Sequence, residues 1–215
     1  MSGHRLRTIA GLCGIAGPVA LTVYFAAPAL TNWPYAGASA AHLTAYAGSH
    51  QTLFFAGAWF QATGTLLSIV FFLAIVQLAG ASTRLPGMVV VVASAALLGL
   101  VLVEAALLTE VPLAAANGDS ATVVTTFDLS NGVFARVFPL APASATYVGL
   151  GAVILGSSVV HRWFGYVAVG LGLAFEVAGI VALFTIAGLI LAIILSVAQE
   201  IWIVAAAVAL LRQPR

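Results

Sequence analysis

The chain has 215 residues, 63% of them hydrophobic and only 6% charged, with a formal net charge of +1 and a mean hydropathy of +1.17. Soluble domains carry charge on about a quarter of their residues. This composition therefore excludes an ordinary water-soluble fold, and a net charge near zero gives no basis for nucleic-acid binding. The single cysteine, Cys13, excludes an internal disulfide and a cysteine metal cluster.

Apolar stretches of about 20 residues are long enough to cross a membrane as helices. The run after Arg5 and Arg7 resembles a signal peptide, but it is too long for one and further spans follow, so we expect a retained first helix. The sequence predicts an all-α, six-helix transmembrane bundle in a single domain, 1–215. Its spans are expected at about 9–30, 53–78, 88–108, 138–159, 164–184 and 187–211.

Two segments between spans carry structure of their own. The outer loop 31–50 contains a short helix predicted to start at Ser39, and residues 117–120 form a turn and N-cap for an amphipathic segment reaching Leu129. Pro139 and Pro142 are expected to bend the fourth span. The pattern leaves open whether this region is one bent helix or a re-entrant piece followed by a short span.

The arginines predict the orientation. With six spans both termini lie on one side, and six of the seven arginines fall there, Arg136 being the exception. By the positive-inside rule that side is the cytoplasm, which predicts a multi-pass protein of the bacterial inner membrane with cytoplasmic N- and C-termini. The six are Arg5, Arg7, Arg84, Arg162, Arg212 and Arg215.

Two segments carry a resemblance to a known family. Residues 37–50, GASAAHLTAYAGSH, lead into Leu53-Phe-Phe-Ala-Gly57, and a later turn reads His161-Arg-Trp-Phe-Gly165. Together they resemble a family of small, actinobacterial-type, six-helix membrane proteins catalogued as a domain of unknown function. Phe55 departs from that pattern, in which a basic residue is expected. The resemblance covers about a quarter of the chain and implies a bacterial six-helix protein, but no activity and no catalytic residue.

Three glutamates, Glu104, Glu176 and Glu200, interrupt the apolar spans. A carboxylate at the bilayer centre costs about 3 kcal/mol on insertion scales, so an intramembrane acid is a functional candidate. At 1.5 Å per residue, Glu176 lies about 18 Å from the inner start of its span and Glu200 about 20 Å from the outer start of its own, both near the midplane. Glu104 lies about 25 Å from its inner start, in the outer third. We predict these three as the catalytic residues.

Polar and aromatic residues on neighbouring spans are candidates for lining a pocket around these acids. Helical spacing places three polar residues of the second span on one stripe, and places Ser196 and Glu200 on one face of the sixth. Arg136, at the outer mouth of the fourth span, is expected either to pair with Glu104, Glu110 or Asp128, or to grip an anionic headgroup or phosphate. The predicted substrate-binding residues are Gln61, Thr65, Ser68, Arg136, Tyr147, Phe175, Ser196, Gln199 and Trp202.

The sequence gives little support for a bound metal, haem or retinal. His42 and His50 lie in the outer loop, where histidines are more often interfacial than metal ligands, so no metal is predicted. The spans hold no histidine for haem, and the chain holds no lysine for a retinal Schiff base. No aspartate-rich motif for magnesium and diphosphate is present, which argues against prenyl transfer.

Three classes of function remain. The first is a membrane enzyme in which Glu176 and Glu200 serve as acid and stabilising carboxylate in the protonation-initiated cyclisation of an isoprenoid. Its architecture is similar to that of membrane-bound terpene cyclases. The second is a proton-coupled transporter of hydrophobic compounds. The third is an accessory subunit with its glutamates as hydrogen-bonding glue. The expected partners are membrane lipid, a lipophilic small molecule and, as an option, further copies of the chain.

Overall fold

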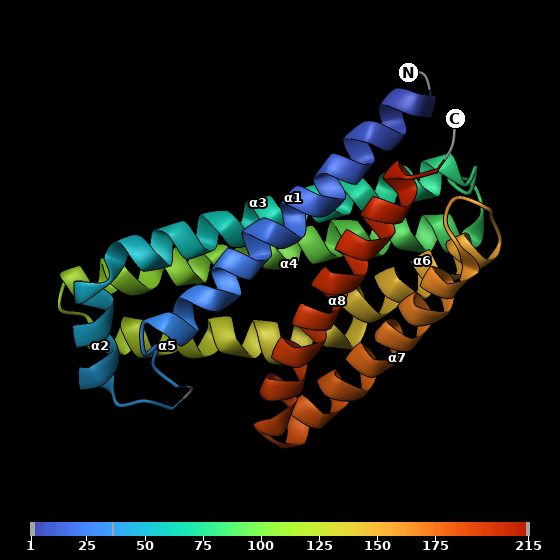
Figure 1. Cartoon of the computed structure of the whole chain (residues 1–215). Helices are drawn as coiled ribbons and strands as arrows, with labels where there is room; N and C mark the ends of the chain where they lie inside the picture. Colours follow the sequence, from blue (N-terminus) through green and yellow to red (C-terminus); the bar gives the residue numbers. More distant parts are fainter. Residues whose placement is uncertain (1–2, 36, 214–215) are drawn as a thin grey trace.

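The computed structural model describes residues 3–35 and 37–213, and every regular element in these ranges is helical (Figure 1). Six segments have the length and apolar composition to cross a membrane, which confirms the predicted all-α, multi-pass architecture. The elements are α1 (Gly3–Leu30), α2 (Ala40–Ser49), α3 (Gln51–Leu78), α4 (Leu85–Ala116), α5 (Ser120–Gly132), the π-helical turns η1 (Val133–Val137) and η2 (Pro139–Ala143), α6 (Ser144–Leu155), α7 (Arg162–Phe184) and α8 (Ala187–Leu211).

The described ends of the chain lie together. The first turns of α1 and the last turns of α8 are at one end of the bundle, here called the terminal end, while α2 and the start of α5 lie at the opposite end, the α2 end (Figure 1). Figure 1 also shows α7 and α8 as a hairpin that turns back before it reaches the α2 end. The α2 end is therefore built mainly from α2, α3, α4 and α5.

Small residues let α1 and α3 approach closely. A Cβ atom on Gly17 would lie 2.8 Å from the carbonyl oxygen of Gly64, and one on Gly64 would lie 2.8 Å from the carbonyl oxygen of Gly17. Only glycine fits at such a backbone-to-backbone contact. In lipid the hydrophobic effect does not drive helices together, so membrane helices commonly associate through close packing of small residues. This crossing fixes the height of α1 against α3.

The fourth span differs from the expected one. The helical segment is continuous from Ser120 to Leu155, so the amphipathic segment and the span form one helix rather than a re-entrant piece. The two π-helical turns fall around Pro139 and Pro142, where the missing N–H groups interrupt regular α-helical bonding. The helix ends at Leu155 instead of 159, because Gly156 starts the irregular segment that leads to α7.

Side-chain caps begin two of the elements near the predicted residues. Ser39 Oγ accepts a bond from the His42 backbone N–H at 3.3 Å and starts α2. Asp119 caps α5, accepting from the Thr122 hydroxyl at 2.6 Å and from the Thr122 N–H at 3.1 Å. These bonds to Thr122 lower the pKa of the Asp119 carboxyl. Both caps fix helices at the α2 end.

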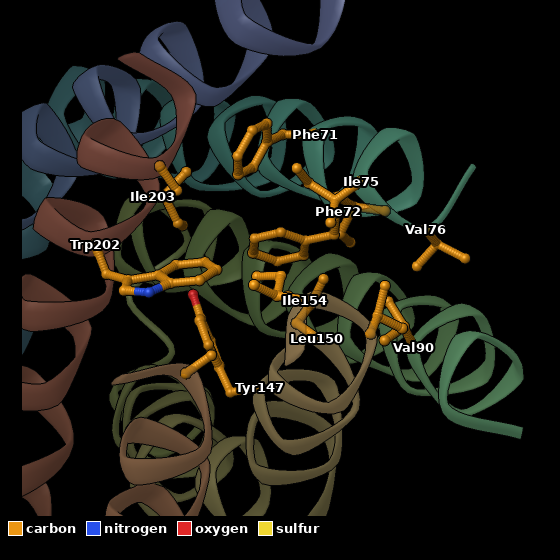
Figure 2. Packing of buried hydrophobic residues seen from close by; sticks show 14 of the residues in the cluster. Phe71, Phe72, Ile75, Val76, Val90, Tyr147, Leu150, Ile154, Trp202 and Ile203 are labelled. Atoms are coloured by element: carbon orange, nitrogen blue, oxygen red, sulfur yellow. The ribbon is translucent and has the colours of Figure 1, made fainter. Parts of the chain in front are cut away.

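Aromatic side chains fill the centre of the bundle (Figure 2). The Tyr147 ring makes edge-on contacts with Phe72 and Trp202, at centroid distances of 5.7 and 5.5 Å. Figure 2 shows the Tyr147 hydroxyl directed toward the Trp202 indole. A second cluster at the α2 end packs Trp33 against Phe54, at 4.6 Å, and against Phe127, at 6.1 Å. Trp33, Phe54 and Phe127 of this second cluster also line the cavity of the candidate site that lies toward the α2 end.

Candidate functional site

A cavity of about 470 Å³ lies toward the α2 end, between α1, α3, α4, α5, η1 and the start of α8. We call it the Glu104 cavity, because Glu104 is its one acidic wall residue in the described part of the chain. Its size falls in the range of small-molecule sites, about 300–1,000 Å³. Its remaining walls are largely apolar and aromatic, and they include Tyr24, Phe25, Trp33, Phe54, Leu108, Phe127, Phe134, Leu189, Ile190 and Ile193.

Two polar side chains hold the carboxyl of Glu104, a residue that is only 3% exposed. The Tyr24 hydroxyl donates to Glu104 Oε1 at 3.4 Å, and the Gln61 side-chain amide lies against the same carboxyl group. Gln61 Oε1 is buried and has no hydrogen-bond partner among the described residues. Rotating the Gln61 amide by half a turn would therefore present an acceptor to a protonated Glu104, so Gln61 suits either charge state.

Helical spacing brings these groups together. On α4, Leu97, Val101, Glu104 and Leu108 repeat every three or four residues and are all buried, so Glu104 points inward with the core-facing stripe. On α1, Tyr24 lies seven residues after Gly17, two helical turns along the face that packs against α3. A Cβ on Gly57 of α3 would lie 3.5 Å from the Tyr24 ring. Because α1 and α3 cross closely, the Tyr24 hydroxyl lies within hydrogen-bonding distance of Glu104.

A second hollow, the Glu200 groove, runs between α1 and α8 and has a volume of about 650 Å³. Glu200 is only 4% exposed, and its Oε2 accepts a bond from Thr22 Oγ1 at 2.8 Å. Its Oε1 is buried without a hydrogen-bond partner in the described chain, and so is the hydroxyl of Tyr147, which interacts electrostatically with Glu200. Phe25 lines both hollows and lies between them.

The structure does not bring Glu176 and Glu200 together in either hollow. Glu176 is half-buried on α7, lines neither of the two, and makes no hydrogen bond or ion pair with another described residue. Its neighbours on the helix, Gly172 and Gly179, pack against α6 and η2. A shared depth was the basis for predicting this pair, but depth does not fix the direction in which a side chain leaves its helix.

Among the other predicted residues, the three aromatic ones belong to the core. Tyr147, Phe175 and Trp202 line neither hollow, and the Trp202 Nε1–H donates to the carbonyl of Phe164 at 3.0 Å. The Tyr147 and Phe175 rings lie 5.9 Å apart. These residues position α6, α7 and α8 rather than contact a ligand in the Glu104 cavity.

The predicted polar residues of α3 and α8 are also buried away from the two hollows. The hydroxyls of Ser68 and Ser196 each donate to a carbonyl one turn earlier in their own helix, that of Gly64 at 2.9 Å and that of Ala192 at 2.8 Å. Thr65 and Gln199 are buried and line neither hollow. Of the predicted binding residues, Gln61 hydrogen-bonds to Glu104, and Tyr147 interacts electrostatically with Glu200.

Arg136 has a partner that the sequence does not indicate. Its Nε–H donates to the carbonyl oxygen of Ala182 at 3.3 Å, near the C-terminus of α7. A cation there complements the partial negative charge of the helix end. No ion pair with Glu104, Glu110 or Asp128 is formed among the described residues, and Arg136 does not line the Glu104 cavity.

Two site residues escape sequence reasoning, Thr22 and Tyr24. Both lie in the first span, whose other residues near them are apolar, so neither attracts notice beside three charged glutamates. The sequence does carry one signal for them, which is their spacing. Two hydroxyl residues two positions apart face nearly opposite sides of a helix.

In the outer loop, His50 stacks on Tyr46, and no group of three possible metal ligands gathers in the described part of the chain.

Comparison with known proteins gives no match, whether to a family model, a curated protein or a solved structure. The resemblance to the small actinobacterial-type family and the likeness to membrane-bound terpene cyclases therefore stay predictions. What the fold and site define is a multi-pass helical membrane protein with an acid-bearing, mainly apolar cavity within its bundle.

Proposed function

We propose that this chain is a membrane enzyme that binds a lipophilic substrate in the Glu104 cavity and uses Glu104 as its acid. The observation that carries the proposal is the position of Glu104. It is the one acidic group in the described lining of an apolar, aromatic cavity, and Tyr24 and Gln61 hold it in place. Neutral carboxyl groups in apolar sites serve as general acids in several enzymes.

The lining favours an uncharged substrate. No arginine or lysine lies among the described cavity residues, so an anionic group such as a diphosphate would have no counter-charge there. The aliphatic wall from Leu189, Ile190 and Ile193 suits a hydrocarbon chain, and Ser130 and Asn131 add the few further polar atoms. An uncharged isoprenoid alkene or epoxide fits this chemistry best.

The reaction we propose is an isomerisation. The Glu104 O–H bond breaks as its proton adds to the alkene or epoxide, and an internal alkene attacks the resulting carbocation to form a ring. Loss of a proton from the cyclised cation to the Glu104 carboxylate restores the acid, so that atoms and charge balance without a co-reactant. Phe25, Trp33 and Phe127 place aromatic faces around the cavity, where they would stabilise the cation and exclude water.

The proposed location is the bacterial cytoplasmic membrane, with the terminal end of the bundle in the cytoplasm. Arg5 and Arg7 lie in the first turns of α1, Arg84 immediately precedes α4, Arg162 starts α7 and Arg212 follows α8. This distribution supports the orientation through the positive-inside rule. The Glu104 cavity would then lie in the outer half of the membrane.

The test uses purified protein in nanodiscs, prepared in deuterium oxide and supplied with an uncharged isoprenoid epoxide. An epoxide takes the proton on oxygen, so the label is read on a second substrate, an uncharged isoprenoid polyene, whose cyclised product we expect to carry one deuterium on carbon in the wild type. With either substrate, Glu104→Gln should lower the rate at least about 100-fold, the usual contribution of a general acid. Glu176→Gln is the matched control, because it removes an intramembrane acid that lines neither hollow. Full activity in Glu104→Gln, or no substrate binding by the wild type, would refute the proposal.

Proton-coupled transport of a hydrophobic compound is the second candidate, favoured by the fact that Phe25 lines both acid-bearing hollows. A compound passing Phe25 would move between Glu104 and Glu200. In proteoliposomes with a pH gradient, a transporter would accumulate such a compound without changing its mass, whereas the enzyme would change its structure.

A further inference from the structure

The Glu200 groove is a hollow of its own, apart from the Glu104 cavity. Its walls come from α1 and α8, and its described lining is apolar except for Thr22 and Glu200. Glu200 is deeply buried at the groove, while Thr22, Ile201 and Ala205 on its walls are exposed. The groove therefore presents a carboxyl group within an apolar surface that lipid-dissolved molecules can reach.

The Glu200 carboxyl lacks a second partner. Thr22 supplies one hydrogen bond, to Oε2, whereas Oε1 is buried and receives none from the described residues. Buried polar atoms are hydrogen-bonded in the large majority of cases, and a buried charge is normally paired. Glu200 lines the groove and its carboxyl has one oxygen without a partner, so this carboxyl marks the place where a donor from outside the chain fits.

No described basic residue supplies the missing counter-charge. Five arginines lie at helix ends of the terminal end of the bundle, Arg136 donates to the Ala182 carbonyl, and the chain has no lysine. Tyr147, which interacts electrostatically with Glu200, carries a hydroxyl that is itself without a hydrogen-bond partner in the described chain. Glu200 therefore has neither a basic partner nor a second hydrogen-bond donor among the described residues.

We propose that the Glu200 groove is a binding site for a lipophilic cation, whose ammonium group donates a hydrogen bond to the Glu200 carboxyl and whose hydrocarbon part lies between α1 and α8. A charge-assisted N–H···O bond is about twice as strong as a neutral one. The apolar groove walls cover the hydrocarbon part, and Phe25 adds an aromatic face at one end. This site does not depend on the reaction proposed for the Glu104 cavity.

The probe is 4-phenylbutylammonium, compared with 4-phenylbutanol, an uncharged molecule of similar shape. Binding is measured by equilibrium dialysis against phosphatidylcholine nanodiscs that hold the protein, after subtracting uptake by empty nanodiscs. We expect the amine to bind the wild type at least tenfold more tightly than the alcohol, and Glu200→Gln to abolish that preference. Glu104→Gln and Glu176→Gln, each removing another intramembrane acid, are expected to retain it.

A second variant keeps the test valid if Glu200→Gln fails to fold. Ala205 is exposed at the groove wall, so Ala205→Trp fills the groove from the lipid side without entering the core, and it should also lower amine affinity at least tenfold. Equal binding of amine and alcohol would show that the groove only contacts lipid. Loss of binding in Glu104→Gln with retention in Glu200→Gln would place the cation in the Glu104 cavity. Either result overturns the proposal.

Discussion

Thr22 and Tyr24, two residues apart on α1, donate their hydroxyl groups to two different buried glutamates. Thr22 bonds Glu200 Oε2 at 2.8 Å, and Tyr24 bonds Glu104 Oε1 at 3.4 Å. Because positions two apart on a helix differ by about 200° in direction, α1 presents one hydroxyl to each hollow. Changing either hydroxyl therefore perturbs one acid at a time.

Replacing Tyr24 by phenylalanine should destabilise the protein by about 1 kcal/mol, the usual net worth of a hydrogen bond, because Glu104 Oε1 loses its donor. The measurement is the free energy of unfolding in mixed micelles. Tyr35→Phe is the matched control, since Tyr35 lines the same cavity but is 75% exposed. An equal loss in both variants would contradict a specific role for the Tyr24 hydroxyl.

Gly64→Ala should destabilise the bundle by about 1–3 kcal/mol, the range for overpacking a close contact. The new Cβ would lie 2.8 Å from the Gly17 carbonyl oxygen, which is backbone and can move away only if α1 moves. Gly99→Ala serves as the control, because a Cβ there meets nothing within 4 Å. Thermal unfolding followed by circular dichroism compares the two, and a smaller loss at Gly64 than at Gly99 would argue against the crossing.

Tyr147→Phe should leave stability unchanged or slightly raised, because the hydroxyl it removes is buried with no hydrogen-bond partner in the described chain. Trp202→Phe provides the contrast. It loses the bond to the Phe164 carbonyl and part of a packed ring, and should cost about 1–3 kcal/mol. A Tyr147→Phe loss as large as that of Trp202→Phe would mean that the Tyr147 hydroxyl is bonded in the membrane.

Single cysteines on a Cys13→Ala background test the proposed orientation. Ser82 lies in the turn between α3 and α4 at the terminal end, and Asn117 lies between α4 and α5 at the α2 end. A membrane-impermeant thiol reagent should label Asn117→Cys in intact cells and Ser82→Cys only after permeabilisation. The reverse pattern would place the termini outside and move the Glu104 cavity to the inner half of the membrane.

The sequence predicts the spans well because crossing a membrane demands a simple and local property, about 20 apolar residues. It predicts the fourth span less well. Pro139 and Pro142 are expected to bend it and leave a re-entrant piece open as an alternative, whereas π-helical turns absorb both prolines within one helix that already begins at Ser120. The end of α4 shows the same effect, for the helix continues through Pro112 to Ala116 rather than stopping near 108.

The candidate site is harder to predict, because it depends on how helices face one another. Glu104 and Gln61 are identifiable as polar residues in apolar spans, and the structure does place them together. The pairing of Glu176 with Glu200 rests on depth alone and ignores rotation about each helix axis. Trp33 reaches the cavity from a loop, and Tyr24 reaches it because α1 crosses α3 closely, and the sequence does not say which helices will cross.

The two π-helical turns between α5 and α6 determine how far α6 is rotated about the helix axis relative to α5. A π turn accommodates an extra residue within a helix, so deleting one residue from 133–143 would turn everything beyond it by about 100°. Phe127 would keep its place in the wall of the Glu104 cavity, while Tyr147 would swing away from Phe72 and Trp202. The length of this segment is thus as much a part of the architecture as its composition.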